Sequence, residues 1–206
     1  MTDFFTMASL VFVVGSGIRL ATPFLLAGLG ETIGQRSGVL NLGVDGVMLL
    51  SAFGAYWTIL ETGRPVAGLL VGLGVGLVMG VVYGVVTVTL RAEQGVSGIG
   101  IFLFGLGMSD LLFQKKVGTP LPVRGFGEWH VPVLSRIPKV GEMFFQHSVL
   151  VYLAFLLVPL VAFLLNRTTF GLNVRAVGEN PAAADSLGVS VARVRYKTIL
   201  LANGLA

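Results

Sequence analysis

Four polar residues lie inside apolar stretches of the sequence and are the first candidates for chemistry. Asn41 and Asp45 open one stretch and are four residues apart, so on a helix they would share one face. Arg19 and Asp110 lie in two other stretches. A charged side chain at the centre of a membrane helix costs about 2.5 to 3.5 kcal/mol, so it must face a partner, water or the bundle interior.

These residues leave two interpretations open. Asn41, Asp45 and Asp110 are candidates for a polar lining of a translocation path, and the glycines around Asn41 suggest an irregular helix start there. The same residues could instead make structural hydrogen bonds between helices, or, for Asp110, reach the headgroups. Arg19 can pair with a carboxylate on another helix or extend to the membrane interface.

No catalytic constellation accompanies them. The sequence has no cysteine, and His130 and His147 lie too far from other ligand types to suggest a metal site. It contains no nucleophile elbow and no phosphate-binding P-loop. We therefore predict that this chain is not an enzyme and holds no metal or cofactor of its own.

The elements that carry these residues are predicted from composition. Apolar residues make up 54% of the chain and charged residues 12%, with a mean hydropathy of +0.88, whereas soluble domains carry about 25% charged residues. We predict an all-α, polytopic transmembrane bundle that forms a single domain over residues 1–206 in a lipid bilayer. Five apolar stretches approach the length needed to cross a membrane. They are Thr6–Leu29, Val39–Leu60, Pro65–Leu90, Val96–Phe113 and Val149–Leu165, and a sixth begins near Thr198.

The charged residues predict on which side of the membrane the segments between the spans lie. The net charge of +4 is explained by basic residues in loops, where orientation rules place them, so no nucleic-acid partner is predicted. We expect residues 166–197 on the cytoplasmic side and residues 114–147 outside. The outer segment is proline-rich and contains Trp129. It is either a membrane-surface loop or a docking surface for a soluble protein that delivers substrate.

Glycines recur at every fourth position of the third stretch: Gly68, Gly72, Gly76, Gly80 and Gly84. In lipid, helices associate closely where small residues form a stripe along one face. We predict that this stripe packs against a neighbouring helix and has no transport role of its own.

A polar segment, residues 166–197, separates the fifth stretch from the sixth. Asn180 can cap a helix whose first residue is Pro181, and Gly188 suits the stop. Ser190 is then a second N-cap. The segment therefore predicts a short helix, a tight turn and a new helix, and its charged residues suggest contact with a soluble partner.

Two runs resemble a known family. The run Arg-Ala-Val-Gly-Glu-Asn-Pro-Ala-Ala-Ala at Arg175–Ala184 resembles the cytoplasmic loop of permeases of bacterial ABC importers. The run Gln35–Leu50 looks most like the nucleoside and simple-sugar branch and less like the branched-chain amino acid branch. The resemblance covers most of the chain.

The resemblance implies a function and partners. A permease subunit in the bacterial plasma (inner) membrane would pair with a second permease subunit, two ATPases that bind ATP and Mg²⁺, and an extracytoplasmic substrate-binding protein. The short helix would insert in a groove of the ATPase. The residues implied in this coupling are Arg175, Glu179, Asn180, Pro181, Asp185 and Gly188.

Alternatives remain at this stage. An ion- or proton-coupled secondary transporter would use Asp45, Arg19 and Asp110 as a relay and would need no ATPase. A branched-chain amino acid permease is a second alternative, and a scaffold subunit without a pore is a third. Members of the resembled family are longer than this chain, so we also expect the sequence to be truncated at its C-terminal end.

Overall fold

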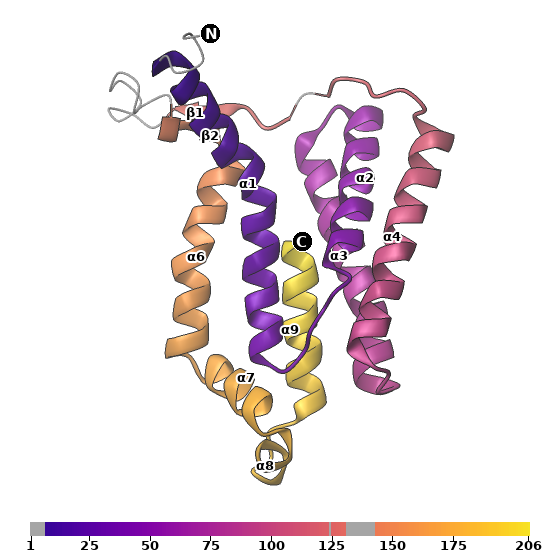
Figure 1. Cartoon of the computed structure of the whole chain (residues 1–206), viewed down its shortest axis with the longest axis vertical. Helices are drawn as coiled ribbons and strands as arrows, with labels where there is room; N and C mark the ends of the chain where they lie inside the picture. Colours follow the sequence, from indigo (N-terminus) through magenta and orange to yellow (C-terminus); the bar gives the residue numbers. More distant parts are fainter. Residues whose placement is uncertain (1–6, 124, 131–142) are drawn as a thin grey trace.

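The computed structural model describes residues 7–123, 125–130 and 143–206 as an assembly of helices (Figure 1). The helices are α1 (Met7–Arg36), α2 (Val44–Thr62), α3 (Pro65–Gly84) with a π-helical extension η2 (Val85–Thr89), α4 (Gln94–Lys116), α6 (Val149–Arg167), α7 (Thr169–Glu179), α8 (Pro181–Ser186) and α9 (Val191–Leu205). The predicted all-α bundle is confirmed.

Four helical segments of the described chain are long and apolar enough to cross a membrane: Ser9–Arg36, Pro65–Thr89, Gln94–Lys116 and Val149–Arg167. The predicted second span, Val39–Leu60, is not among them. Its helix α2 begins only at Val44 and carries Asp45 in its first turn, which shortens and polarises the segment. Even so, α2 packs along α3 and α4 (Figure 1).

The predicted outer segment, residues 114–147, contains a short antiparallel pairing. Strand β1 (Glu128–His130) pairs with β2 (Gln146–Ser148), with Trp129 opposite His147. The Trp129 ring also lies edge-on to Tyr152 of α6, with ring centroids 5.9 Å apart. Residues 124 and 131–142, which include Pro132 and Pro138, lie outside the described residues.

The glycine stripe of α3 faces two different helices. A Cβ on Gly68 would lie 2.8 Å from the Ala55 carbonyl oxygen of α2, and a Cβ on Gly76 would lie 2.3 Å from the Asn203 carbonyl oxygen of α9. Real Cβ atoms do not approach that closely, so these backbones touch only because the residues are glycine. Towards Gly84 the stripe continues against α9, where the nearest group is the Tyr196 ring.

Two buried clusters hold the elements together. One joins α1, α6, α7, α8 and α9 around Ile33, Val161, Val174, Ala184 and Val194. The other joins α2, α3, α4 and α9 with the chain just before α2, around Val39, Val47, Tyr83, Ile101 and Ile199. Helix α9 contributes to both, so it is the element that connects the lower end of the molecule to its middle.

Candidate functional site

Helix α8 is fixed by its own flanking residues. The Asn180 side chain accepts a hydrogen bond from the Ala183 N–H at 3.0 Å, and Pro181 occupies the first turn. At the other end Gly188 has a φ of +82°, and its N–H donates to the Asp185 carbonyl at 2.9 Å. The predicted helix start at Asn180-Pro181 and the stop at Gly188 are therefore confirmed. Ser190 precedes α9, but its side chain makes no capping bond.

Almost all of α8 faces outward. Ala184, at 3% exposure, is its only buried residue, and Figure 1 shows α8 at the lower extremity of the molecule, between α7 and α9. Leu187 follows directly and is 83% exposed, the most exposed large apolar side chain of the described chain. Sequence reasoning did not single out Leu187, although a leucine that ends a capped helix in a polar segment is a usable signal.

Helix α7 precedes α8 and was not predicted from the sequence. Thr168 caps it by accepting from the Gly171 N–H at 3.1 Å. Val174 and Val177 are fully buried beneath the bundle, and with Phe170 they follow the i, i+4, i+7 spacing of an amphipathic helix. That spacing was obscured by the polar residues between them.

The predicted coupling residues do not form one surface. Glu179, Asn180, Pro181, Asp185 and Gly188 are all exposed on α8 and its flanks. Arg175 is not among them. Its side chain is partly buried and lines a cavity of about 220 Å³ between α1, α6 and α7. A contact with the same partner surface as α8 is therefore not supported for Arg175 by its position.

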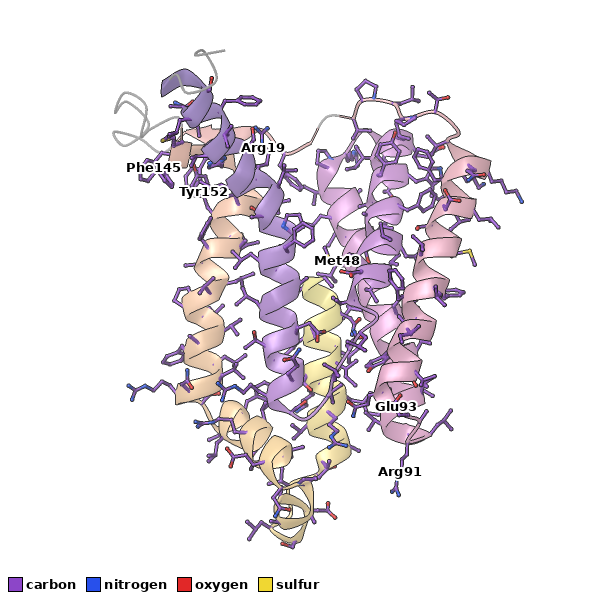
Figure 2. All side chains as sticks on the ribbon, in the orientation of Figure 1. Arg19, Met48, Arg91, Glu93, Phe145 and Tyr152 are labelled. Atoms are coloured by element: carbon purple, nitrogen blue, oxygen red, sulfur yellow. The ribbon has the colours of Figure 1, made fainter. Side chains whose placement is uncertain are left out.

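A larger cavity, of about 750 Å³, lies beside α8. Asp185 of α8, Arg195 of α9 and Arg91 of the turn after η2 line it. Arg91 has a left-handed backbone with a φ of 55°, which is uncommon for a residue other than glycine. Figure 2 shows Arg91 and Glu93 at the lower end of the molecule, the end at which α8 lies.

Glu93 belongs to the same turn and caps α4. Its carboxylate accepts hydrogen bonds from the backbone N–H groups of Gly95 and Val96. These bonds to Val96 and Gly95 favour the charged form and lower the pKa of Glu93 below its ordinary value. The negative charge at the helix N-terminus also complements the helix dipole.

The chain between α1 and α2 is a non-helical break, residues 37–43. Figure 1 shows it rising from the lower end of α1 to the start of α2, about halfway up the bundle. Asn41 lies in this break and not in a helix, so the prediction that Asn41 and Asp45 share a helical face is wrong. The reason is local. Gly38 has a φ of +76°, and the Asn41 side chain accepts from the Gly43 N–H at 2.9 Å, which turns the chain before α2 begins.

Side chains from distant elements satisfy the backbone of the break. The Leu40 N–H donates to the Gln94 side chain at 2.8 Å, and the Leu40 carbonyl accepts from the Tyr83 hydroxyl. The Gln94 amide also donates to the Gly38 carbonyl at 3.3 Å. Non-helical backbone at membrane depth is tolerated only where protein or a cavity receives its polar groups, and here α3 and α4 receive them.

Helix α9 contacts both ends of the break. At the first end the hydroxyls of Ser37 and Thr198 are 2.8 Å apart and hydrogen-bonded, and both residues are fully buried. At the other end the Asn41 amide donates to the Asn203 side chain at 3.3 Å. Because α9 follows α8 directly, a displacement of α8 would reach the break through these two contacts.

The remaining path candidates lie apart from one another. Asp45 is exposed in the first turn of α2. Asp110 accepts from Gln114 at 2.8 Å and lines a separate cavity of about 510 Å³ with Tyr56 and Phe113. Arg19 is exposed on α1. Within the described ranges no cluster of three or more His, Cys, Asp or Glu side chains that could hold a metal is found.

Comparisons with known proteins follow this geometry. A protein of Haloferax volcanii, whose name describes a glucose ABC transporter permease, is 37% identical over 198 residues, which cover 94% of this chain and 60% of that protein. The nucleoside ABC transporter permease protein of Lactococcus lactis is 34% identical over 206 residues, covering 96% of this chain and 65% of that protein. No solved structure matches.

A third relative, the guanosine ABC transporter permease protein NupQ of Bacillus subtilis, is 32% identical over 207 residues, covering 94% of this chain and 64% of that protein. The chain thus spans 60 to 65% of the length of these relatives. The family model described as branched-chain amino acid transport system / permease component matches residues 13–206. This match covers nearly the whole chain, and the chain belongs to that family of transport-system permease components.

Proposed function

We propose that the chain is part of a permease subunit of an ATP-driven ABC importer that carries a nucleoside or a simple sugar across a bacterial inner membrane. The solute class rests on the relatives, which are named for glucose, nucleoside and guanosine transport. They favour this branch over branched-chain amino acids, which the family description names. The subunit itself carries no ATP site in this proposal.

One observation carries the coupling role: α8 is a capped helix with a single buried residue, Ala184, and only a short turn separates it from α9, which reaches the middle of the bundle. A helix of two turns is marginal in water, so its caps at Asn180 and Gly188 preform it for a partner. The partner is an ATPase subunit that binds ATP and Mg²⁺. Leu187 anchors the contact, and Glu179 and Asp185 supply charge at its rim.

The route of transmission runs through α9. Movement of the ATPase displaces α8, and α9 moves with it because only the tight turn at Gly188 separates them. The hydrogen bonds of Thr198 to Ser37 and of Asn203 to Asn41 then shift the break at mid-depth. The break lines or gates the path between this subunit and a second permease subunit. An extracytoplasmic binding protein delivers the solute.

The test compares two exposed leucines of the same polar segment. The permease expressed from its complete gene is co-purified with its ATPase, as wild type, as Leu187→Asp and as Leu172→Asp. Leu172 is 58% exposed on α7 and is the matched control. Loss of a central apolar anchor weakens an interface by about 2 kcal/mol or more, so we expect ATPase recovery to fall at least about tenfold for Leu187→Asp and to be unchanged for Leu172→Asp. Equal recovery with both variants would remove α8 from the interface.

The rival is a secondary transporter, and uptake separates the two. Its relay would require Asp45, Arg19 and Asp110 to cooperate, and none of the described contacts joins any two of them. Uptake that stops when the ATPase is inactivated supports the importer. Uptake that continues without ATP hydrolysis and stops on collapse of the ion gradient supports the secondary transporter.

A further inference from the structure

The cavity that Arg175 lines has a polar end and an apolar wall. Arg36, at the end of α1, and Arg175, on α7, supply the polar end. The wall consists of Leu29 on α1 with Val158 and Ala162 on α6. Both α1 and α6 belong to segments that are long and apolar enough to cross a membrane. Arg36 ends the first of these segments, and Arg175 lies on α7, the helix that follows the second.

Within the part of the chain that the structure describes, the two guanidinium groups have no protein partner. Among the described residues neither Arg36 nor Arg175 makes an ion pair or a side-chain hydrogen bond, and the Arg175 Nε is fully buried without a partner. Leaving a buried donor unsatisfied costs about 1 to 3 kcal/mol, and more for a charged group. Arg36 is itself exposed, so this cost falls on Arg175 alone. Two cations that line one cavity without a counter-ion among the described residues nevertheless favour an anion there.

The neighbouring polar groups do not supply that anion. The Asn166 amide donates to the Ala162 carbonyl of its own helix at 2.9 Å, and the Thr32 hydroxyl donates to the carbonyl four residues earlier at 2.8 Å. The carboxylate of Glu31, one residue from Thr32, is hydrogen-bonded to the Gln35 side chain and to the backbone of Asn41. Neither of these partners lines the cavity with Arg175, and among the described residues no ion pair joins Glu31 to either arginine.

The shape of the cavity selects among anions. Leu29 and Arg36 are two helical turns apart, so the lining on α1 extends about 10 Å along the helix axis from the Arg36 backbone. A small soluble anion would use the arginines alone and leave this wall without an occupant. A phosphodiester that carries acyl chains would use both, because guanidinium groups bind phosphate oxygens in a bidentate manner.

We propose that this cavity binds an anionic phospholipid, with its phosphodiester on Arg36 and Arg175 and an acyl chain along Leu29 and Val158. Basic pockets between membrane helices are suited to anionic headgroups. The lipid contacts α1, α6 and α7 at once. It thereby fixes α7, the helix that leads into α8, to the two spans above it.

The first experiment measures lipid binding by native mass spectrometry. The permease expressed from its complete gene is purified in mild detergent and titrated with phosphatidylglycerol or, separately, phosphatidylcholine. Variants are Arg36→Gln with Arg175→Gln, and Arg167→Gln as the matched control. Arg167 is exposed at the end of α6 and does not line the cavity. Each arginine contributes about 1 kcal/mol, so we expect phosphatidylglycerol binding to weaken about 25-fold in the double variant and less than twofold in the control.

A second variant separates lipid from free phosphate and does not depend on the charges. Ala162→Phe fills the apolar wall and leaves both arginines in place. We expect it to abolish phosphatidylglycerol binding, and we expect inorganic phosphate in large excess not to displace the lipid from the wild type. Unaltered lipid binding in Ala162→Phe, or displacement by phosphate, would mean a site for small anions and overturn the proposal.

Other results overturn it as well. If phosphatidylcholine binds as tightly as phosphatidylglycerol, the arginines do not select an anion. If Arg167→Gln weakens binding as much as the double variant, the effect is general surface charge. If the wild type retains neither lipid, another protein segment fills the cavity.

Discussion

Helix α8 and the break at residues 37–43 are opposite solutions to the same requirement, that every backbone polar group be paired. Helix α8 is regular and exposed, and its ends are satisfied by Asn180 and by the turn at Gly188. The break is irregular, and its backbone is paired by Tyr83 and Gln94, which lie more than forty residues away in the sequence.

The difference separates local from tertiary specification. A helix with its own caps forms its shape before it meets a partner, so it can act as a rigid handle. A break held by side chains from α3, α4 and α9 has the shape that those helices impose. It can therefore respond when one of them moves, which the gating role proposed above requires.

The largest expected effect comes from separating α9 from α3 beside the break. In Gly76→Ala the new Cβ would lie 2.3 Å from the Asn203 carbonyl oxygen, and overpacking of this kind costs about 1 to 3 kcal/mol. Thermal unfolding of the purified permease measures the loss. Gly74→Ala is the control because nothing lies within 4 Å of its added Cβ. Equal melting temperatures for the two variants would contradict the close α3–α9 contact.

The next effect tests whether α8 is specified locally. In Asn180→Ala the capping bond to the Ala183 N–H is lost, which costs about 1 kcal/mol. Hydrogen exchange of the amides of residues 182–186 should speed up, whereas the melting temperature of the bundle should stay the same. Ser190→Ala is the matched control, since the Ser190 side chain makes no capping bond to α9. Faster exchange in α8 for Ser190→Ala as well would point to a tertiary origin of its order.

A smaller effect measures the link between α9 and the break. Asn41→Ala, Asn203→Ala and the double variant form a thermodynamic cycle, which removes the contribution of the Asn41 bond to Gly43. Side-chain hydrogen bonds between membrane helices average about 0.6 kcal/mol and reach about 1.7 kcal/mol. We expect a coupling energy in that range from unfolding in denaturant. If the stability losses of the two single variants add exactly in the double variant, the 3.3 Å contact between the two amides contributes no coupling energy.

The smallest effect concerns the exposed cap of α4. The pKa of Glu93 is lowered because its carboxylate accepts the Val96 and Gly95 N–H groups. The stability that the charged Glu93 carboxylate adds to the folded protein is therefore fully present above the pKa that Glu93 has in the unfolded chain. It is lost as the pH falls through the lowered pKa of Glu93 in the folded chain. Protection of these two amides, corrected for intrinsic exchange rates, should decrease on acidification. In Glu93→Gln we expect no such decrease, and an identical pH profile in both proteins would exclude the carboxylate as the cause.

Sequence patterns predicted the features that depend on neighbouring residues. Continuous apolar runs predicted the helical bundle, since only helices satisfy their backbone within one such segment. The order Asn180, Pro181 and Gly188 predicted the bounds of α8, because capping acts over three or four residues. A prediction that assumed a helix without such a local signal was wrong. Asn41 and Asp45 share no helical face, because α2 begins after Asn41.

The sequence by itself thus determined the all-helical class of the long apolar segments, where α8 begins and ends, and that α3 presents a stripe of glycines, whereas it did not reveal α7 or the late start of α2. Only the tertiary structure decided that the stripe meets α2 at Gly68 and α9 at Gly76, that Arg175 faces α1 and α6 rather than α8, and that the break is closed by α9. The physical reason is the distance along the sequence over which each interaction acts. Caps and hydropathy act between residues close in sequence, whereas a glycine stripe, an unpaired arginine and a non-helical backbone take their partners from segments that folding brings together.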